Sequence, residues 1–271
     1  MTMVVGVDVG GTKVAAGVID ATTGRVGDIV TVPTHAAREP NEILERCAAL
    51  ATQVAVGHRC EAVGLGVCEL VDRSGRITSA NSLDWRGLDV SGAFAAIAPC
   101  HVESDMRAAA LAEARVGAGA DVATFLYAGI GTGAACAFVV DGVVHVGARG
   151  NAIFLGTPSL EARSGGAALN RRFGPDLAAT MDRAVVGEAI VAAAADVGRA
   201  IGIVVNAVDP HVVIVGGGLG TNERYFGALV DSVRATIYAE DTAQLPIVRS
   251  VLGVRGGVIG AALAAWDALG P

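Results

Sequence analysis

Three short glycine-rich segments constrain this chain more than any other feature. Each follows an apolar, strand-like run, and they are Gly10–Gly11, Gly129–Gly133 and Gly216–Gly220. Glycine lets the backbone turn tightly and lets a ligand approach the backbone N–H groups. In α/β proteins, ligands bind at the carboxyl ends of strands, which is where these segments fall. Together the three segments predict an α/β protein that binds a nucleotide.

Strand-like and helix-like segments alternate along the chain, which predicts an α/β architecture. Residues 4–9 and 14–20 predict two strands around the first glycine turn. Helical spacing of apolar residues follows in three longer segments, residues 41–56, 105–116 and 185–207. A weaker signal is an internal repeat, because Gly10 and Asp20 recur 121 residues later as Gly131 and Asp141. The repeat suggests a duplicated domain with a cleft between its halves.

Composition argues against several classes of protein. The 271 residues carry 20 basic and 27 acidic side chains, and a net charge of −7 disfavours nucleic acid and anionic membranes as partners. No run of about 20 apolar residues is free of charges and glycine clusters, so we expect no membrane span. The N-terminal residues lack a basic leader, which predicts a cytoplasmic protein. The five cysteines have no metal-ligand spacing, so we expect no local zinc knuckle.

The first glycine turn carries the chemistry of a phosphate site. Gly10 and Gly11 expose backbone N–H groups, Thr12 adds a hydroxyl donor and Lys13 adds a positive charge. Asp8, at the end of the preceding strand, is a candidate to hold Mg²⁺ through water. The alternative is a plain tight hairpin, for which adjacent glycines are also common. For Lys13 the alternative is a side chain that simply faces solvent.

The other two glycine segments suit the rest of a nucleotide. Gly131, Thr132 and Gly133 form a second strand–turn–strand with the same phosphate-binding chemistry. Gly216, Gly217 and Gly218 lie between a strand and a helix, where a backbone without side chains can lie against an adenine or ribose. Neither segment is a Walker loop, because no GxxxxGK[ST] pattern is present.

Four segments, in this order, resemble the ROK family of sugar kinases and sugar-responsive repressors: residues 8–13, 126–133, 206–218 and 256–262. The resemblance implies a duplicated actin-like (ribonuclease H-like) two-domain α/β fold with a central nucleotide and sugar cleft. It implies an N-terminal lobe of residues 1–103, on which a terminal helix of about 257–270 packs back, and a C-terminal lobe of residues 104–256. It also implies ATP and Mg²⁺ as cofactors and a homodimer. The family's repressors carry a helix-turn-helix ahead of this aspartate, and the seven residues before Asp8 are too few for one. We therefore expect a DNA-binding repressor least among the family's functions.

The resemblance also assigns a catalytic base. Phosphoryl transfer to an alcohol needs a carboxylate that accepts the hydroxyl proton. Asp105 matches the family's helix-starting aspartate, and Ser104 stands where the family usually has a substrate-contacting asparagine. The alternative is that Ser104 or Asp105 merely caps the helix. Both roles are compatible in one residue.

The expected sugar-binding side departs from the family pattern. The family's Gly-Glu-x-Gly-His motif and zinc-binding cysteines are missing: Phe154 replaces the glutamate, Thr157 replaces the histidine, and only Glu161 of the later set remains. No structural zinc is therefore expected. Phe154 is a candidate to stack on a less polar ring, and the alternative is a core residue with the alignment shifted by a turn. Losing these hydrogen-bonding groups weakens selectivity for plain glucose.

Two upstream residues complete the expected substrate contacts. Asn81 matches the asparagine that reaches the sugar in relatives, with a simple turn asparagine as the alternative. Glu69 is a carboxylate that the family pattern lacks, and it either contacts an amino group of the substrate or is a solvated loop residue. The sequence thus predicts an ATP-dependent kinase of a hexose, amino sugar or C7-cyclitol, acting on the exocyclic primary alcohol. A non-catalytic sugar- or nucleotide-binding protein is the alternative.

Overall fold

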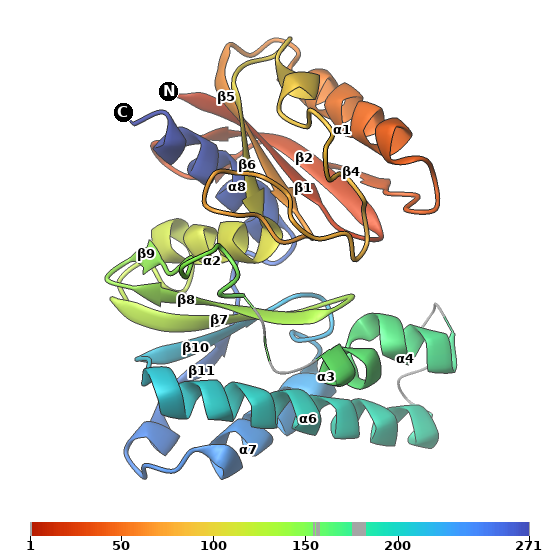
Figure 1. The fold of residues 1–271 in the computed structure, drawn as a ribbon. Helices are drawn as coiled ribbons and strands as arrows, with labels where there is room; N and C mark the ends of the chain where they lie inside the picture. The colour runs from red at the N-terminus through yellow and green to blue at the C-terminus, as the bar shows by residue number, and fades with distance from the viewer. Residues whose placement is uncertain (1, 154, 156–157, 175–182, 271) are drawn as a thin grey trace. The chain divides into compact units, whose positions relative to one another are not determined.

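Two α/β units make up the chain in the computed structural model, which describes residues 2–153, 155, 158–174 and 183–270 (Figure 1). Unit 1 comprises Met1–Ala120, Val143–Ala152 and Val254–Pro271, and unit 2 comprises Asp121–Gly142 and Ile153–Gly253. Each unit has its own sheet and its own hydrophobic core.

The sheet of unit 1 has the strand order β3-β2-β1-β5-β6, and β4 pairs with β2. Its strands are β1 (Met3–Val9), β2 (Lys13–Asp20), β3 (Arg25–Val26), β4 (Val30–Pro33), β5 (Cys60–Val67) and β6 (Cys100–Ser104). β1 and β2 form an antiparallel hairpin, whereas β1, β5 and β6 are parallel. The register places Val9 beside Val67 and Val67 beside Ser104. The three parallel strands therefore end at one carboxyl edge.

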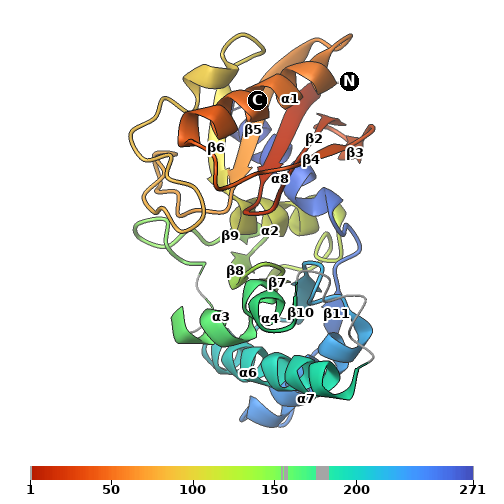
Figure 2. The same cartoon turned by 90° about the vertical axis from the view of Figure 1, so that its right-hand side faces the viewer.

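Helices cover both faces of this sheet (Figure 2). They are α1 (Pro40–Ala55), the short η1 (Gly92–Phe94), α2 (Asp105–Val116) and α8 (Arg255–Ala268), and unit 1 also holds the short strand β9 (Val143–Val144). Side chains alternate along a strand, so Val5, Val7 and Val9 join the core that contains the buried residues of α1. The opposite positions of β1 face α8, and Gly6 is one of them, because a Cβ there would overlap the Val258 carbonyl.

Glycine at two further positions lets α8 approach its neighbours closely. A Cβ on Gly64 of β5 would overlap the carbonyl of Ala261 in α8. A Cβ on Gly260 of α8 would overlap the carbonyl of Ala108 in α2. α8 is thus packed backbone-to-backbone against the sheet and against α2, which explains the glycine- and alanine-rich end of the sequence.

Unit 2 has the strand order β11-β10-β7-β8. Its strands are β7 (Thr124–Ile130), β8 (Ala134–Val140), β10 (Val212–Gly216) and β11 (Ile247–Arg249), and its helices are α3 (Pro158–Ser164), α4 (Gly166–Phe173), α6 (Ala184–Val208), α7 (Glu223–Thr236) and the short η2 (Thr242–Gln244). Gly198 and Gly202 of α6 permit close packing on α7, since a Cβ at either would overlap atoms of that helix. Ile190, Val197 and Ile201 of α6 are fully buried in the core of this unit.

The topology of unit 2 repeats that of unit 1. In each, an antiparallel hairpin (β1–β2 or β7–β8) is followed by a strand that pairs in parallel with the first strand of the hairpin (β5 or β10). The predicted duplicated α/β fold is confirmed. None of the helices in the described part of the chain has both the length and the apolar character needed to cross a membrane.

The two units divide the chain differently from the expected lobes. We expected the second lobe to comprise residues 104–256, yet α2 lies in unit 1, as do residues 143–152 and 254–256. The reason is packing, because α2 contacts α8 extensively and also touches β5 and β6. α8, the terminal helix, also lies in unit 1.

Candidate functional site

Asp8 lies at the carboxyl edge of the unit 1 sheet. It is the penultimate residue of β1, partly buried, and on the face covered by α8. A Cβ on Gly257, in the first turn of α8, would overlap the Asp8 carboxylate, so this glycine makes room for the acid. Burial raises the pKa of Asp8 to about 6, while the nearby positive charge of Lys13 lowers it.

The turn after Asp8 has two of its carbonyls bound by Thr34, and two of its amides are open. The Gly10 N–H donates to the Lys13 carbonyl (2.9 Å), and Thr34 binds the carbonyls of Gly10 (2.6 Å, through its hydroxyl) and Thr12 (3.0 Å, through its N–H). Within the described residues, no backbone hydrogen bond of this turn uses the N–H of Gly11 or Thr12. The side chains of Thr12 and Lys13 are exposed. Such a turn is suited to an anion.

Asp105 opens α2 directly after β6, at the same edge as Asp8. Its Oδ1 accepts a hydrogen bond from the Met106 N–H (2.7 Å). The pKa of Asp105 is raised to about 7, mainly by burial, then by the negative charge of Asp8, with a smaller contribution from Glu69, while the Met106 hydrogen bond lowers it. A carboxyl group with a pKa near neutrality can accept a proton and release it again at physiological pH.

Ser104 occupies the N-cap position of α2 but its side chain makes no capping hydrogen bond. Its hydroxyl is fully buried and has no hydrogen-bond partner among the described residues. The capping alternative is therefore not met by Ser104. Asp105 binds the N–H of the next residue instead.

An ion pair fixes the start of α2. Arg107 is buried, its Nε donates to Glu103 Oε1 (2.7 Å), and its terminal nitrogens donate to the carbonyls of Val71 (2.7 Å) and Gly150. Glu103 Oε1 also accepts the Ser104 N–H (2.7 Å). Arg107 therefore ties the helix that carries Asp105 to two surrounding loops.

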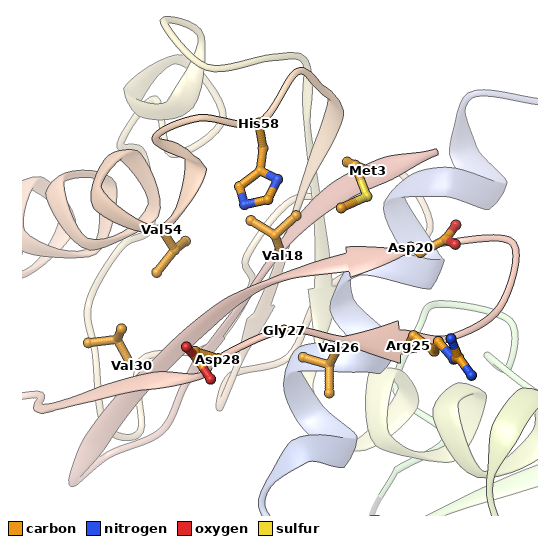
Figure 3. Close-up of a pocket in the computed structure, with 10 residues that line it drawn as sticks. All are labelled: Met3, Val18, Asp20, Arg25, Val26, Gly27, Asp28, Val30, Val54 and His58. Atoms are coloured by element: carbon orange, nitrogen blue, oxygen red, sulfur yellow. The ribbon is translucent and has the colours of Figure 1, made fainter. Parts of the chain in front are cut away.

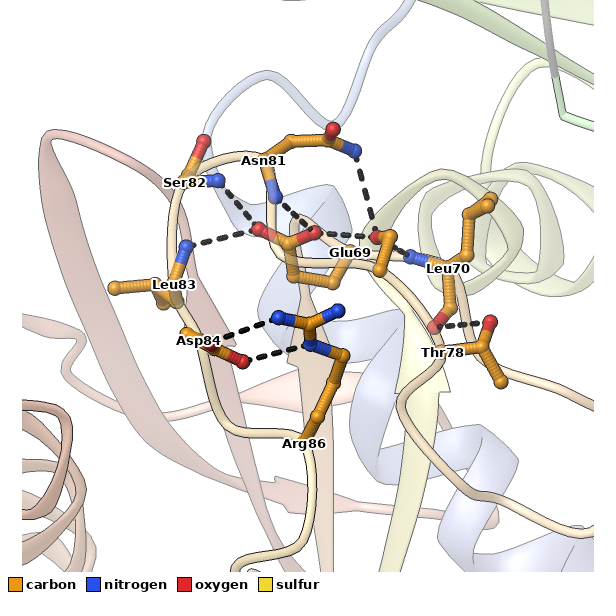
Figure 4. Close-up of polar contacts among 9 residues, drawn as sticks. Glu69, Leu70, Thr78, Asn81, Ser82, Leu83, Asp84 and Arg86 are labelled. Atoms are coloured by element: carbon orange, nitrogen blue, oxygen red, sulfur yellow. Dashed lines mark hydrogen bonds and ion pairs between the residues drawn. The ribbon is translucent and has the colours of Figure 1, made fainter.

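Glu69 and Asn81 come from the two sides of the loop after β5 (Figure 4). Glu69 is 3% exposed, and its carboxylate accepts hydrogen bonds from residues 79 and 81–83. The Asn81 side chain is exposed and its amide nitrogen donates to Ser79 Oγ (3.4 Å). Glu69 is therefore not the solvated loop residue of the alternative, and its carboxylate is bound by the loop itself.

The β7–β8 turn of unit 2 is held by α4. The N–H groups of Gly166 and Ala167 donate to the carbonyls of Gly131 and Thr132, each at 2.9 Å. Within the turn, the Gly131 N–H donates to the Gly133 carbonyl (2.9 Å), and the Thr132 side chain is exposed. A Cβ on Gly131 would meet nothing within 4 Å, so its backbone is open to a ligand.

Glu161 of α3 lies against the same turn. Its Oε1 accepts the N–H of Ala134 (3.2 Å), and a Cβ on Gly133 would overlap it. Glu161 is exposed. Of the other expected residues on this side of the sugar site, Phe154 and Thr157 lie outside the described residues.

The third glycine segment follows β10 in unit 2. Gly217 has a φ of +81°, and the N–H groups of Leu219 and Gly220 both donate to the Ile130 carbonyl (3.1 and 2.9 Å). Gly216 is buried, whereas Gly218 is exposed with open space where a Cβ would stand. The segment offers a bare backbone surface beside the end of β7.

A magnesium ion fits the donor set at the unit 1 edge. The described residues hold no group of three or more His, Cys, Asp and Glu side chains arranged for a metal. Mg²⁺ commonly binds through one or two carboxylates, several waters and substrate phosphates. Asp8, with a raised pKa and the charge of Asp105 nearby, is a carboxylate that a divalent cation would stabilise in its ionised form.

A cavity of about 470 Å³ lies elsewhere in unit 1 (Figure 3). It is lined by aliphatic side chains such as Val18 and Val54 and by polar ones including Asp20, Asp28 and His58. Met3 and Asp20 pair at the end of the hairpin opposite Asp8, so this cavity is remote from the Asp8 edge. None of the residues expected to bind substrate or cofactor lines it.

Sequence reasoning missed three contributors to this edge. Ser79 and Arg107 act through hydrogen bonds to a carboxylate or to backbone carbonyls, and Gly257 acts by leaving space for Asp8. Only Arg107 had a usable signal, since its i,i+4 spacing from Glu103 predicts an ion pair.

Comparisons with known proteins show the family of the chain. The ROK family profile matches residues 4–172 and 174–268. A glucokinase of Streptomyces coelicolor is 35% identical over 136 residues, which is 49% of this chain and 42% of that protein; the match thus spans less than half of that relative.

Solved structures cover more of the chain. A ROK family glucokinase of Streptomyces griseus, in complex with glucose and AMPPNP, has a TM-score of 0.86 and 26% identity over 98% of this chain and 99% of its own. A ROK hexokinase of Thermus thermophilus has a TM-score of 0.78 and 31% identity over 99% of both chains. The duplicated actin-like α/β chain described here belongs to the ROK family.

Proposed function

We propose that this chain is an ATP- and Mg²⁺-dependent kinase that phosphorylates the exocyclic primary alcohol of a hexose or hexose-like molecule. The observation that carries the proposal is Asp105, a partly buried carboxyl group at a strand end with a pKa of about 7. Supporting it are the family membership and the likeness to a glucokinase bound to glucose and AMPPNP.

Each unit supplies a different part of the chemistry. In unit 1, Asp105 accepts the proton of the substrate hydroxyl as its oxygen attacks the γ-phosphorus in line and ADP leaves. Gly10 and Gly11 let the phosphate approach the backbone, where the open N–H groups of Gly11 and Thr12, with the side chains of Thr12 and Lys13, contact it. In unit 2, Gly131, Thr132 and Gly133 bind phosphate and Gly216–Gly218 flank the nucleoside.

Asp8 would hold the metal, through water. When bound, Mg²⁺ neutralises the charge that develops on the phosphoryl oxygens. Of the sugar side, Asn81, Ser104, Glu161 and Phe154 are the proposed contacts. Because Phe154 and Thr157 replace two polar residues of the family pattern, we place an amino sugar or C7-cyclitol beside glucose as the substrate. We also propose that the protein acts in the cytoplasm as a homodimer.

The test is ADP release with ATP and Mg²⁺ across glucose, mannose, amino and N-acetylated hexoses and a C7-cyclitol. We expect one substrate to be turned over, and Asp105→Asn to lower its kcat about 100- to 10,000-fold while nucleotide and sugar binding persist by calorimetry. The matched control is Asp28→Asn, which removes an exposed carboxylate of unit 1 beside the remote cavity and should leave turnover unchanged. Unchanged turnover in Asp105→Asn would remove the base assignment. Nucleotide binding with a silent panel would favour a non-catalytic binding protein.

A further inference from the structure

Glu69 is a buried acidic side chain that the mechanism above does not use. It follows β5 by two residues and is 3% exposed, at the carboxyl edge that also carries Asp8 and Asp105. Among the described residues it has no cation within ion-pair distance, since the nearby Arg86 pairs with Asp84 (2.8 Å). A buried carboxylate without a cation needs hydrogen-bond donors in place of the water that it has lost.

The donors come from a single segment of the loop. Oε1 accepts the N–H groups of Ser82 (2.6 Å) and Leu83 (2.9 Å), and Oε2 accepts the N–H of Asn81 (2.8 Å) and the hydroxyl of Ser79. Figure 4 shows these bonds converging on the carboxylate. Three consecutive backbone N–H groups that point to one spot form an anion-binding nest, and here the chain's own Glu69 fills it.

Ser79 extends this network to both sides of the loop. Its oxygen accepts hydrogen bonds from the Leu70 N–H (2.8 Å) and from the Asn81 side-chain amide (3.4 Å), and its hydroxyl group donates a hydrogen bond to Glu69. The conformation of Asn81 is therefore set twice, through its backbone N–H by Glu69 and through its side chain by Ser79. A second constraint on the loop is the antiparallel bridge between Val71 and Ile77.

The segment that Glu69 holds also borders the phosphate turn. A Cβ on Gly11 would lie 3.4 Å from Ser82 Oγ, so residues 81–83 and the β1–β2 turn are neighbours. The charge of Glu69 also reaches Asp105, whose pKa it helps to raise. A shift of this segment would change the surroundings of both the phosphate turn and the base.

We propose that Glu69 is a positioning residue for the acceptor sugar: its carboxylate holds residues 79–83 in the conformation that presents Asn81 at the edge carrying Asp105. The proposal deepens the kinase function given above and rests on it. Glu69 itself does not touch the substrate, because both of its oxygens are already engaged by the loop.

Chemistry explains why a glutamate is required. A glutamine keeps the shape, but its NH₂ group would face two of the four donors and could accept neither bond. An aspartate is one methylene shorter and would not reach all three amides. The loop should then sample other conformations, and the sugar should lose a pre-positioned partner.

The experiment compares Glu69→Gln with Asp20→Asn. Asp20 is a matched control: it is 8% exposed and also accepts four hydrogen bonds, one from Thr2 before β1 and three from Thr22 and Thr23 in the turn after β2, but at the opposite end of the β1–β2 hairpin. We expect Glu69→Gln to raise KM for the sugar about tenfold or more, with kcat within threefold and KM for ATP within twofold. Asp20→Asn should lower Tm without changing KM for the sugar.

A second measurement follows the loop itself. Amide hydrogen exchange of residues 81–83 should accelerate at least tenfold in Glu69→Gln and stay unchanged in Asp20→Asn. Ser79→Ala is a milder change, because it removes only one of the four hydrogen bonds to Glu69. It should raise KM for the sugar two- to threefold. An unchanged KM in Glu69→Gln, with a wild type that phosphorylates the sugar, would overturn the positioning role and leave the kinase intact.

Failure of the kinase function has a different signature. If the wild type turns over no sugar, the amide exchange rates still test whether Glu69 holds residues 79–83 in place. Accelerated exchange at residues 81–83 would support a loop-holding role for Glu69, and unchanged exchange would overturn it.

Discussion

The two glycine hairpins of this protein share a strand topology but differ in the side chains around their turns. In unit 1 the Gly10 N–H bonds the Lys13 carbonyl across the turn, and in unit 2 the Gly131 N–H bonds the Gly133 carbonyl, both at 2.9 Å. Each hairpin lies beside a parallel strand that follows later in the chain. Yet Asp8 precedes the first turn, and Gly129, 121 residues later, stands in the same place before the second.

The two units therefore differ in the charged side chains near their glycine turns. Unit 1 gathers Asp8, Glu69 and Asp105 at one sheet edge, where burial raises the pKa values of Asp8 and Asp105, and the negative charges of Asp8 and Glu69 raise that of Asp105 further. The glycine turn of unit 2 has a bare backbone, with the Thr132 hydroxyl and the Glu161 carboxylate at its border. Among the described residues, the repeated fold thus places three carboxylates at the edge beside the first glycine turn (Asp8, Glu69 and Asp105) and one beside the second (Glu161).

The largest expected effect comes from removing the carboxylate of Asp8, which has no counterpart before the second glycine turn. Asp8→Asn should lower kcat about 100- to 1,000-fold, because a charge that stabilises the transferring phosphoryl group through the metal is lost. The Mg²⁺ concentration for half-maximal rate should rise in steady-state assays. Asp28→Asn again serves as the control of equal charge change. A kcat within threefold of wild type would show that Asp8 does not hold the metal.

The next effect is on stability and has a defined sign. The pKa of Asp105 is about 7 in the folded protein against 3.8 as the ordinary value, so folding takes up a proton between these pH values. The resulting stabilisation is complete below about pH 4 and is lost as the pH rises through 7. Asp105→Asn should therefore be more stable than wild type at pH 8, by on the order of 1–3 kcal/mol, in urea unfolding.

Asp20, at the opposite end of the same sheet, should have the opposite effect on the pH dependence of stability. Hydrogen bonds from Thr22 and other turn residues lower the pKa of Asp20, so its stabilisation is present at neutral pH and is lost as the pH falls through the folded pKa. Asp20→Asn should destabilise the protein at pH 8, where Asp105→Asn stabilises it. Equal signs for the two variants at pH 8 would contradict the contrast between the two carboxylates.

The smallest effect tests the uncharged hairpin. Gly131→Ala adds a methyl group where nothing lies within 4 Å, so stability should change by less than about 0.5 kcal/mol. The methyl group should hinder the approach of phosphate and raise KM for ATP about tenfold, or about 1.4 kcal/mol. Gly227→Ala on α7, which also has open space, is the matched control and should leave KM for ATP unchanged.

Local sequence patterns predicted much of the fold. The predicted helix 105–116 coincides with α2, and the predicted strands 4–9 and 14–20 lie within β1 and β2. These elements follow from apolar periodicity and from glycine turns, which are written in neighbouring residues. The unit to which α2 belongs was not predictable in this way, because it depends on contacts with α8, about 150 residues later.

The candidate site also combines features that local sequence predicts with features that depend on tertiary contacts. The sequence by itself determined where carboxylates and glycines would stand at strand ends, since strand ends and turns are local features. Only the tertiary structure decided that Glu69 binds a loop rather than solvent, that Gly257 leaves room for Asp8, and that Asp105 has a pKa near 7. The physical reason is that the partners in these contacts are backbone amides, a missing Cβ and excluded water, and none of these has a residue pattern of its own.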